Sequence, residues 1–147
     1  MTAVVGNPLS AYRQAQRRLR ALFAPFTASH CPTCPTPCCR QPTWVRPVDI
    51  ILVEELGFAL PAREGAAGAL IDATLGDGPA LPGAPCEYLG ERGCAFPDDL
   101  RPFGCAAMIC QYMRRDLPAE ELRAIEGAVA RLERAHAALM TALHEPA

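Results

Sequence analysis

The stretch "HCPTCPTPCCR", residues 30–40, places four cysteines and three prolines within eleven residues. Its cysteines follow the spacing C-x2-C-x3-C-C and are Cys31, Cys34, Cys38 and Cys39. Two cysteines separated by two residues can direct both sulfurs to one point, so this spacing recurs in tetrahedral zinc sites and iron–sulfur sites. Prolines after Cys31 and Cys34 fix φ and limit the conformations of the empty loop. We interpret the stretch as a loop stiffened for metal binding.

The second half of the cysteine set lies in "CEYLGERGCAFPDDLRPFGCAAMIC", residues 86–110, and consists of Cys86, Cys94, Cys105 and Cys110. Cys86 and Cys94 flank a segment that predicts a β-hairpin turning near Gly90–Gly93. Pro102 is a suitable start for a short helical turn ahead of the last two cysteines. Eight thiolates match two four-coordinate sites, one four-cysteine cluster with a separate zinc, or a larger thiolate-bridged assembly.

Other cysteine chemistries fit the spacing less well. Cys38 and Cys39 point to opposite sides of an extended backbone, so we expect them to serve different sites, or one of them to lie outside the ligand set. The bacterial ferredoxin run C-x2-C-x2-C-x3-C-P differs in its second gap. The C-x3-C-x2-C run of radical S-adenosylmethionine enzymes has the reverse order. A thioredoxin-like C-x-x-C would need a preceding strand, and none is predicted before His30.

The composition favours one globular domain over residues 1–147, with a cysteine-cluster core at 30–110. Half of the residues are apolar, a fifth are charged, and the formal net charge of −2 gives no basis for nucleic-acid binding. The chain has no lysine, which excludes Schiff-base chemistry.

The N-terminal sequence lacks the apolar core of a signal peptide, and no run approaches the roughly 20 apolar residues that span a bilayer. We therefore expect a cytoplasmic protein with no membrane partner. Thiols stay reduced in that compartment, so clustered cysteines indicate metal ligands or redox groups. Four disulfides in a secreted domain are the alternative.

Two amphipathic helices are predicted to support the cysteine core, at residues 8–26 and 118–144. The first begins with Asn7 as N-cap and Pro8 at the first helical position. Its apolar seam is Leu9, Tyr12, Gln16, Leu19, Phe23 and Phe26. The opposite face carries Arg13, Arg17, Arg18 and Arg20, which we interpret as solvated, with an anion or partner site as the alternative. The second follows Pro118, and its seam is Leu122, Ile125, Val129, Leu132, His136, Leu139 and Leu143. We expect His136 to be a core or interface residue, and the two stripes to pack together or against a second copy of the chain.

The middle of the chain gives weaker signals. Residues Asp49–Leu56 predict a short helix ended by Gly57, although Ile50–Val53 fits a buried strand equally well. A further helix is predicted from about Ala62 to Leu75, followed by a loop over Gly76–Pro85.

The full cysteine pattern resembles the YkgJ-like family of cysteine-cluster proteins, described as zinc- or iron-chelating domains. In chain order the pattern consists of C-x2-C-x3-C-C, C-x7-C, Arg101-Pro102 two residues before a cysteine, and C-x4-C. The match covers residues 31–110 and all eight cysteines. The resemblance implies that these cysteines bind the metal. This chain departs from the family in carrying prolines near the third cysteine, where glycine is common, and in lacking the Arg, Phe and Pro that usually follow Cys105.

A few other residues are candidates for the site. Arg101 is a candidate to reach the cluster and offset thiolate charge, or to form a structural ion pair. Asp98 and Asp99 fit a solvated turn, with orientation of Arg101 or an oxygen ligand as the alternative. His30 is a candidate replacement for one thiolate. Glu54 and Glu55 have no identifiable partner, and no catalytic triad or phosphate-binding loop occurs.

The sequence therefore predicts a mainly α, metal-stabilised domain, with cysteine-rich loops and a short β-hairpin flanked by terminal helices that pack together. The expected function is metal binding, with zinc, iron or an iron–sulfur cluster as cofactor. An iron–sulfur redox protein or metalloenzyme acting on a peptide or protein partner is the second hypothesis, so enzymatic activity stays open. The third is an interaction protein with structural zinc, which binds a partner or itself through the C-terminal helix.

Overall fold

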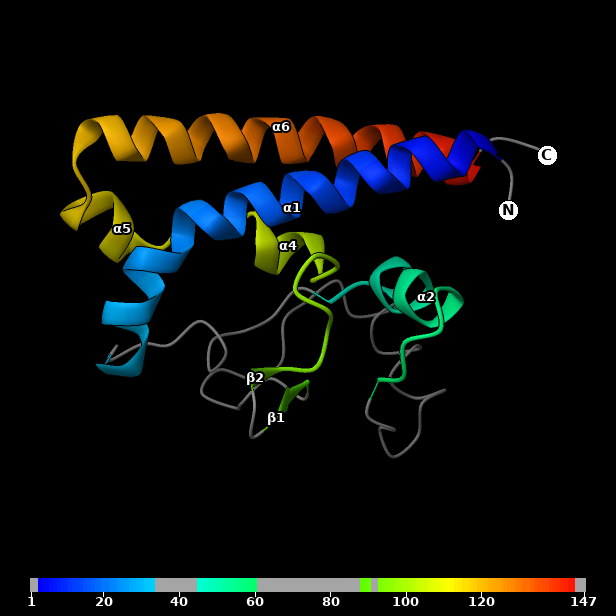
Figure 1. The fold of residues 1–147 in the computed structure, drawn as a ribbon, viewed down its shortest axis with the longest axis horizontal. Helices are drawn as coiled ribbons and strands as arrows, with labels where there is room; N and C mark the ends of the chain where they lie inside the picture. The colour runs from blue at the N-terminus through cyan, green and yellow to red at the C-terminus, as the bar shows by residue number, and fades with distance from the viewer. Residues whose placement is uncertain (1–2, 34–44, 61–87, 91–92, 145–147) are drawn as a thin grey trace. The chain divides into compact units, whose positions relative to one another are not determined.

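The computed structural model of the chain describes residues 3–33, 45–60, 88–90 and 93–144 (Figure 1). The chain divides into two compact units, one formed by both ends of the chain, residues 1–32 and 106–147, and one by residues 33–105. The described part is mainly helical. The helix and loop predicted for residues 62–85 lie outside it, as do Cys34, Cys38, Cys39 and Cys86. None of the described helices is long and apolar enough to cross a bilayer.

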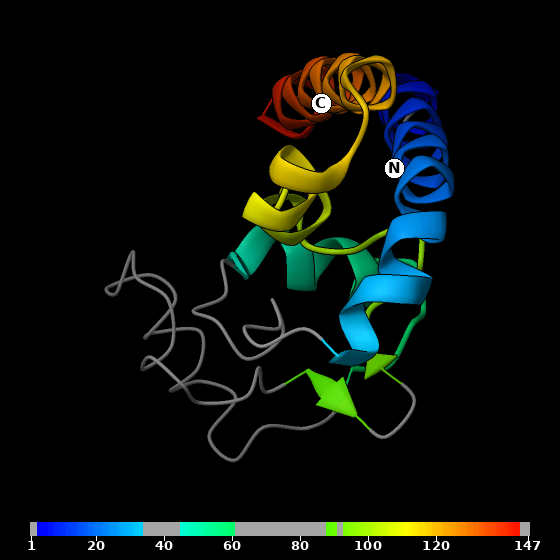
Figure 2. The ribbon, with the colours of Figure 1, turned by 90° about the vertical axis from the view of Figure 1, so that its left-hand side faces the viewer.

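The unit made from the chain ends is built on the packing of α1 (Ala3–His30) against α6 (Ala119–His144). Figures 1 and 2 show the two helices side by side and running in opposite directions. Their buried apolar residues recur at steps of three and four and include Leu9, Tyr12, Leu19, Ile125, Leu132 and Leu139. Each buried leucine contributes about 1.5–3 kcal/mol relative to an exposed one. The predicted packing of the terminal helices is confirmed, and α6 begins directly after Pro118, as expected.

Four residues bear on the predicted seams. Ala128 and Ala142 of α6 are buried, although the prediction counted only larger side chains. Gln16, which interrupts the apolar seam in the sequence, is fully buried in α1. The ring of His136 lies 5.6 Å from that of Tyr12 between centroids, so this histidine contacts the neighbouring helix, as predicted for a core or interface residue.

Helix α1 is longer at both ends than the predicted range 8–26, and the predicted start at Asn7 is wrong. Pro8 lies inside the helix, where its fixed φ is helical and only one nearby carbonyl loses its donor. Pro25 is also inside α1, and Figure 1 shows the helix bending in its C-terminal part. A proline removes one backbone hydrogen bond and is the ordinary cause of such a bend.

The same unit contains a short helix that links the cysteines to α6. Helix α5 (Gln111–Asp116) buries Met113, and the Leu117 N–H caps it by donating to the Met113 carbonyl at 3.0 Å. At the other end of the chain, α1 passes directly into the 3-10 turn η1 (Cys31–Thr33). The first cysteine group therefore begins directly after α1, and the second ends directly before α5.

The second unit contains α2 (Pro47–Glu55), which begins two residues earlier than the predicted helix and overturns the strand alternative for Ile50–Val53. Pro47 occupies the first helical position, and the carboxylate of Asp49 accepts the Arg46 N–H at 2.8 Å. As predicted, Gly57 terminates the helix: it follows the C-cap residue Leu56 and has a φ of +87°. The Phe58 N–H donates to the Val53 carbonyl and the Gly57 N–H to that of Glu54, both at 3.0 Å, in a Schellman motif.

A β-hairpin with two residues in each strand and a short helix complete the described part of this unit. Strand β1 (Leu89–Gly90) pairs antiparallel with β2 (Gly93–Cys94), so that Leu89 faces Cys94. The buried rings of Tyr88 and Phe96 meet edge to face at 5.0 Å. Helix α4 (Phe103–Ala106) follows buried Pro102, whose carbonyl accepts the Cys105 N–H at 3.0 Å. The predicted helical turn at Pro102 is confirmed.

Gly57→Ala should lower the free energy of unfolding by about 1–2 kcal/mol, because a left-handed φ is costly for any residue with a Cβ. No heavy atom lies within 4 Å of the position a Cβ would take, so the cost comes from the backbone alone. Gly127→Ala in α6 is the matched control, since it also meets nothing within 4 Å but has a helical φ, and it should be about 0.5–1 kcal/mol more stable. Urea denaturation measures both, and equal effects of the two substitutions would contradict the assignment.

Candidate metal centre

Four of the eight predicted ligands are described, and each lies at a different structural element. Cys31 begins η1, Cys94 ends β2, Cys105 lies in α4, and Cys110 directly precedes α5. Cys31 and Cys105 are exposed, while Cys94 and Cys110 are partly buried. No disulfide joins these four cysteines to one another. Cys31 and Cys110 belong to the unit made from the chain ends, and Cys94 and Cys105 to the other unit.

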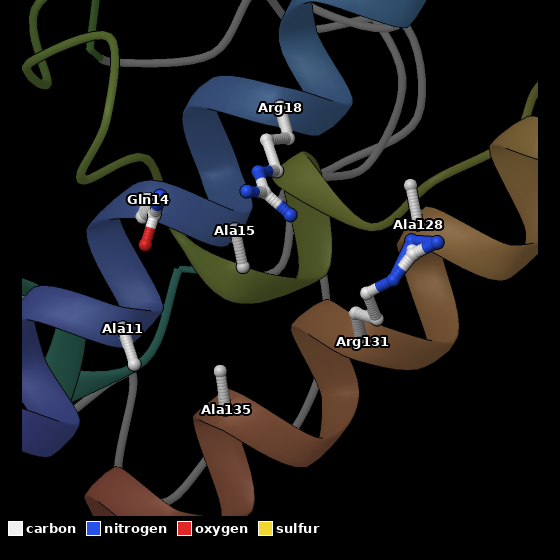
Figure 3. Close-up of a pocket in the computed structure, with 7 residues that line it drawn as sticks. All are labelled: Ala11, Gln14, Ala15, Arg18, Ala128, Arg131 and Ala135. Atoms are coloured by element: carbon white, nitrogen blue, oxygen red, sulfur yellow. The ribbon is translucent and has the colours of Figure 1, made fainter.

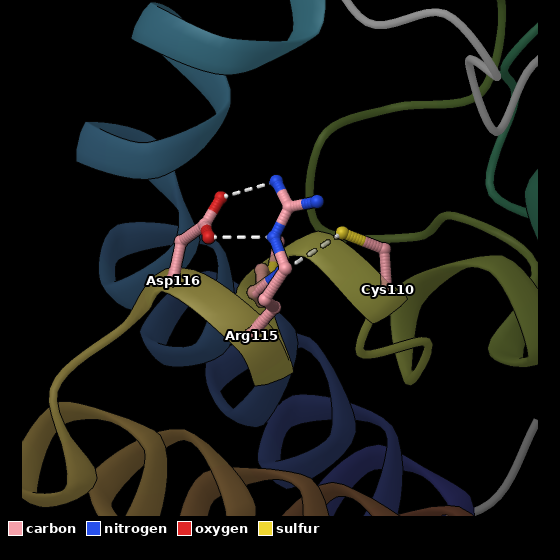
Figure 4. Close-up of polar contacts among 4 residues, drawn as sticks. Cys110, Arg115 and Asp116 are labelled. Atoms are coloured by element: carbon pink, nitrogen blue, oxygen red, sulfur yellow. Dashed lines mark hydrogen bonds and ion pairs between the residues drawn. The ribbon is translucent and has the colours of Figure 1, made fainter.

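The sulfur of Cys110 is the N-cap of α5. Its Sγ accepts the backbone N–H of Met113 at 3.4 Å, a contact in which serine or aspartate oxygens are usual (Figure 4). The hydrogen bond fixes the direction in which the sulfur presents its remaining lone pairs. Metal-bound side chains are commonly oriented by hydrogen bonds of this kind. The position of Cys110 therefore suits a thiolate ligand.

An aromatic contact joins a residue next to the first cysteine and a residue close to the last one. The ring of His30, the residue before Cys31, lies 4.8 Å from that of Phe26 and 4.7 Å from that of Tyr112. Tyr112 is two residues after Cys110. All of these residues belong to the unit made from the chain ends. The first and last cysteines therefore adjoin the same contact between α1 and α5.

An ion pair between Arg115 and Asp116 adjoins this contact. The guanidinium of Arg115 lies 5.2 Å from the centre of the Tyr112 ring, within the range of a cation–π interaction. It also makes two hydrogen bonds to the Asp116 carboxylate, at 2.7 and 2.9 Å (Figure 4). These hydrogen bonds hold the pKa of Asp116 below its ordinary value. Both side chains are largely exposed, so the pair orients Arg115 more than it stabilises the fold.

In the other unit, Asp49 of α2 anchors the helix that carries Cys105. Its carboxylate accepts the Phe103 N–H at the start of α4 at 3.3 Å, besides the Arg46 N–H. The Asp49 side chain is buried, and burial raises its pKa to about 6 against the opposing effect of these hydrogen bonds and of the Arg46 charge. One carboxylate thus fixes the starts of two helices.

The remaining predicted site residues are placed as follows. Arg101 contacts Asp98 at 3.5 Å, with a quarter of the arginine side chain exposed, so the predicted structural ion pair forms. A contact of Arg101 with thiolates stays a prediction. Glu54 and Glu55 are exposed at the end of α2. Within the described ranges, no three histidine, cysteine or acidic side chains converge on one point.

The chain matches no protein-family model, no curated protein and no solved structure. The resemblance to the YkgJ-like family therefore stays a prediction from the cysteine spacing.

Sequence reasoning missed the roles of Asp49 and Tyr112. An acidic residue three positions after an N-cap is a recognised start signal, and Arg46-Pro47 followed by Asp49 carries it. Nothing in the sequence pairs Tyr112 with His30, because that contact joins residues from opposite ends of the chain. An aromatic residue close to a cysteine is the only local signal.

The buried carboxyl of Asp49 should make the unfolding free energy depend on pH. Because its pKa rises from 3.8 to about 6, the folded chain binds a proton between these values that the unfolded chain does not. The contribution of Asp49 should therefore fall as pH rises from about 4 to 6, by about 2–3 kcal/mol at 1.4 kcal/mol per pKa unit. Urea denaturation followed by the fluorescence of Trp44, the single tryptophan, should show this slope in the difference between wild type and Asp49→Asn. A difference that is constant with pH would contradict the prediction.

Proposed function

We propose that this protein binds a transition metal, zinc or iron, through cysteine thiolates, and that Cys31 and Cys110 contribute to the same centre. The observation that carries the proposal is the ring contact of His30 with Tyr112, which adjoins both cysteines within one unit. Eight cysteines in two groups supply enough thiolates for one or two four-coordinate sites.

The surroundings of the two cysteines fit a thiolate centre. Cys31 is exposed at the end of α1 and Cys110 is partly buried, so both sulfurs are accessible to a metal ion. The Met113 N–H orients the Cys110 sulfur, and the Arg115 guanidinium lies over the neighbouring Tyr112 ring. His30 is the adjoining candidate for a nitrogen ligand.

The identity of the metal determines what the centre does. A four-cysteine zinc site has no open coordination position and stabilises the fold. An iron–sulfur cluster with the same ligands transfers electrons or reacts with a bound substrate. Metal binding is the function proposed, and a redox role of the metal follows only if the bound metal is iron.

Substitution of Cys110 separates metal ligation from helix capping. Cys110→Ser keeps an N-cap oxygen for the Met113 N–H but gives a poor ligand for zinc or iron. In protein purified without oxygen, we expect Cys110→Ser to lose most of the bound metal, measured by elemental analysis per chain. Cys110→Ala should lose the metal as well, together with about 1 kcal/mol from the missing cap.

Met108→Ala is the matched control, because Met108 is exposed in the same segment between Cys105 and Cys110. It should retain the metal content of the wild type. If Cys110→Ser retains the metal in full and only Cys110→Ala loses stability, the sulfur acts as a helix cap and not as a ligand.

A further inference from the structure

The α1–α6 pair contains a groove that is lined by no candidate metal ligand. It has a volume of about 200 Å³ and lies within the unit made from the chain ends. Its lining consists of Ala11, Gln14, Ala15, Arg18, Ala128, Arg131 and Ala135 (Figure 3). The floor is therefore made of small apolar side chains from both helices. Alanine at such positions allows the backbone of a third helix to come close.

Two arginines from the two helices flank this floor. Figure 3 shows Arg18 on one helix and Arg131 on the other, with the Arg131 side chain running along α6 toward Ala128. Both are exposed, and within the described ranges neither forms an ion pair. The positions three and four residues away along each helix, where an intrahelical partner would lie, hold no acidic residue. Two like charges thus share an apolar groove with no carboxylate in its lining.

The two helices that form the groove differ in charge. Helix α1 carries four arginines and no aspartate or glutamate, whereas α6 carries both arginines and glutamates, none of the glutamates in the lining. In a symmetric pair of copies meeting groove to groove, Arg18 and Arg131 of each copy would face a lining without carboxylates. A second copy that docks groove to groove is therefore a poor occupant. An occupant with carboxylates complements the groove, and a helical shape fits a furrow between two antiparallel helices.

We propose that this groove docks an acidic amphipathic helix of a partner protein. Small apolar residues of the partner rest on the alanine floor, and its carboxylates lie beside Arg18 and Arg131. The proposal is independent of the metal centre, because none of the lining residues is a candidate ligand.

The test uses the full chain and a synthetic helical peptide with an alanine stripe flanked by glutamates, labelled for fluorescence anisotropy. A peptide with glutamine in place of each glutamate is the control ligand. Arg131→Glu should weaken binding of the acidic peptide by about tenfold, which equals about 1.4 kcal/mol. The matched control is Arg123→Glu, which makes the same charge change at an exposed position of α6 outside the lining, and it should leave binding within about twofold.

A second experiment reverses the charges of both the groove and the peptide. The double variant Arg18→Glu with Arg131→Glu should bind a lysine version of the peptide in preference to the glutamate version. Circular dichroism establishes that each variant is folded. The glutamine peptide measures how much the carboxylates contribute to binding by the unsubstituted chain. Equal loss in Arg123→Glu and Arg131→Glu, equal binding of the glutamate and glutamine peptides, or no binding would overturn the proposal. Gel filtration showing self-association that Arg131→Glu abolishes would also overturn it, because the occupant would then be a second copy.

Discussion

The packing of α1 against α6 is the constraint on which the described structure of the N- and C-terminal unit depends. These helices come from opposite ends of the chain, and their buried faces hold the two ends together. Cys31 directly follows α1, and Cys110 precedes α5, which leads into α6. Once the helices pair, both cysteines belong to one compact unit, and the contact between His30 and Tyr112 can form. The apolar interface between α1 and α6 thus places the segment around His30 and the segment around Tyr112 in one unit, although they lie far apart in the sequence.

The helix pair was predictable because its signal is periodic. Leu132 and Leu139 recur at helical spacing, and both are fully buried, as the pattern indicates. The ends were less predictable, since Pro8 satisfies the rule for a first helical residue yet lies inside α1. Helix α2 was identified with its stop at Gly57, but its start was misplaced because Asp49 was counted as a first residue and not as the residue that caps Arg46.

The candidate site was predictable in its chemistry but not in its arrangement. The spacing of the cysteines identifies thiolate ligands, whereas the partners of those ligands come from tertiary contacts. The hydrogen bond from the Met113 N–H to the Cys110 sulfur joins residues that are close in sequence, yet it forms only because α5 begins at Gln111. The Asp49 carboxylate reaches α4 across a long sequence separation, and burial that no local pattern reveals raises its pKa. Such contacts are determined by packing, so a single sequence carries no direct record of them.

The most direct test of cysteine ligation is X-ray absorption spectroscopy at the edge of the bound metal, on the full chain purified without oxygen. Cysteine ligation predicts a nearest shell of sulfur atoms at about 2.3 Å, the distance of a metal–thiolate bond. It also predicts that this sulfur shell disappears when the cysteines are replaced together by serine. A nearest shell of only nitrogen and oxygen atoms at about 2.0–2.2 Å, or the absence of any bound metal, would contradict it.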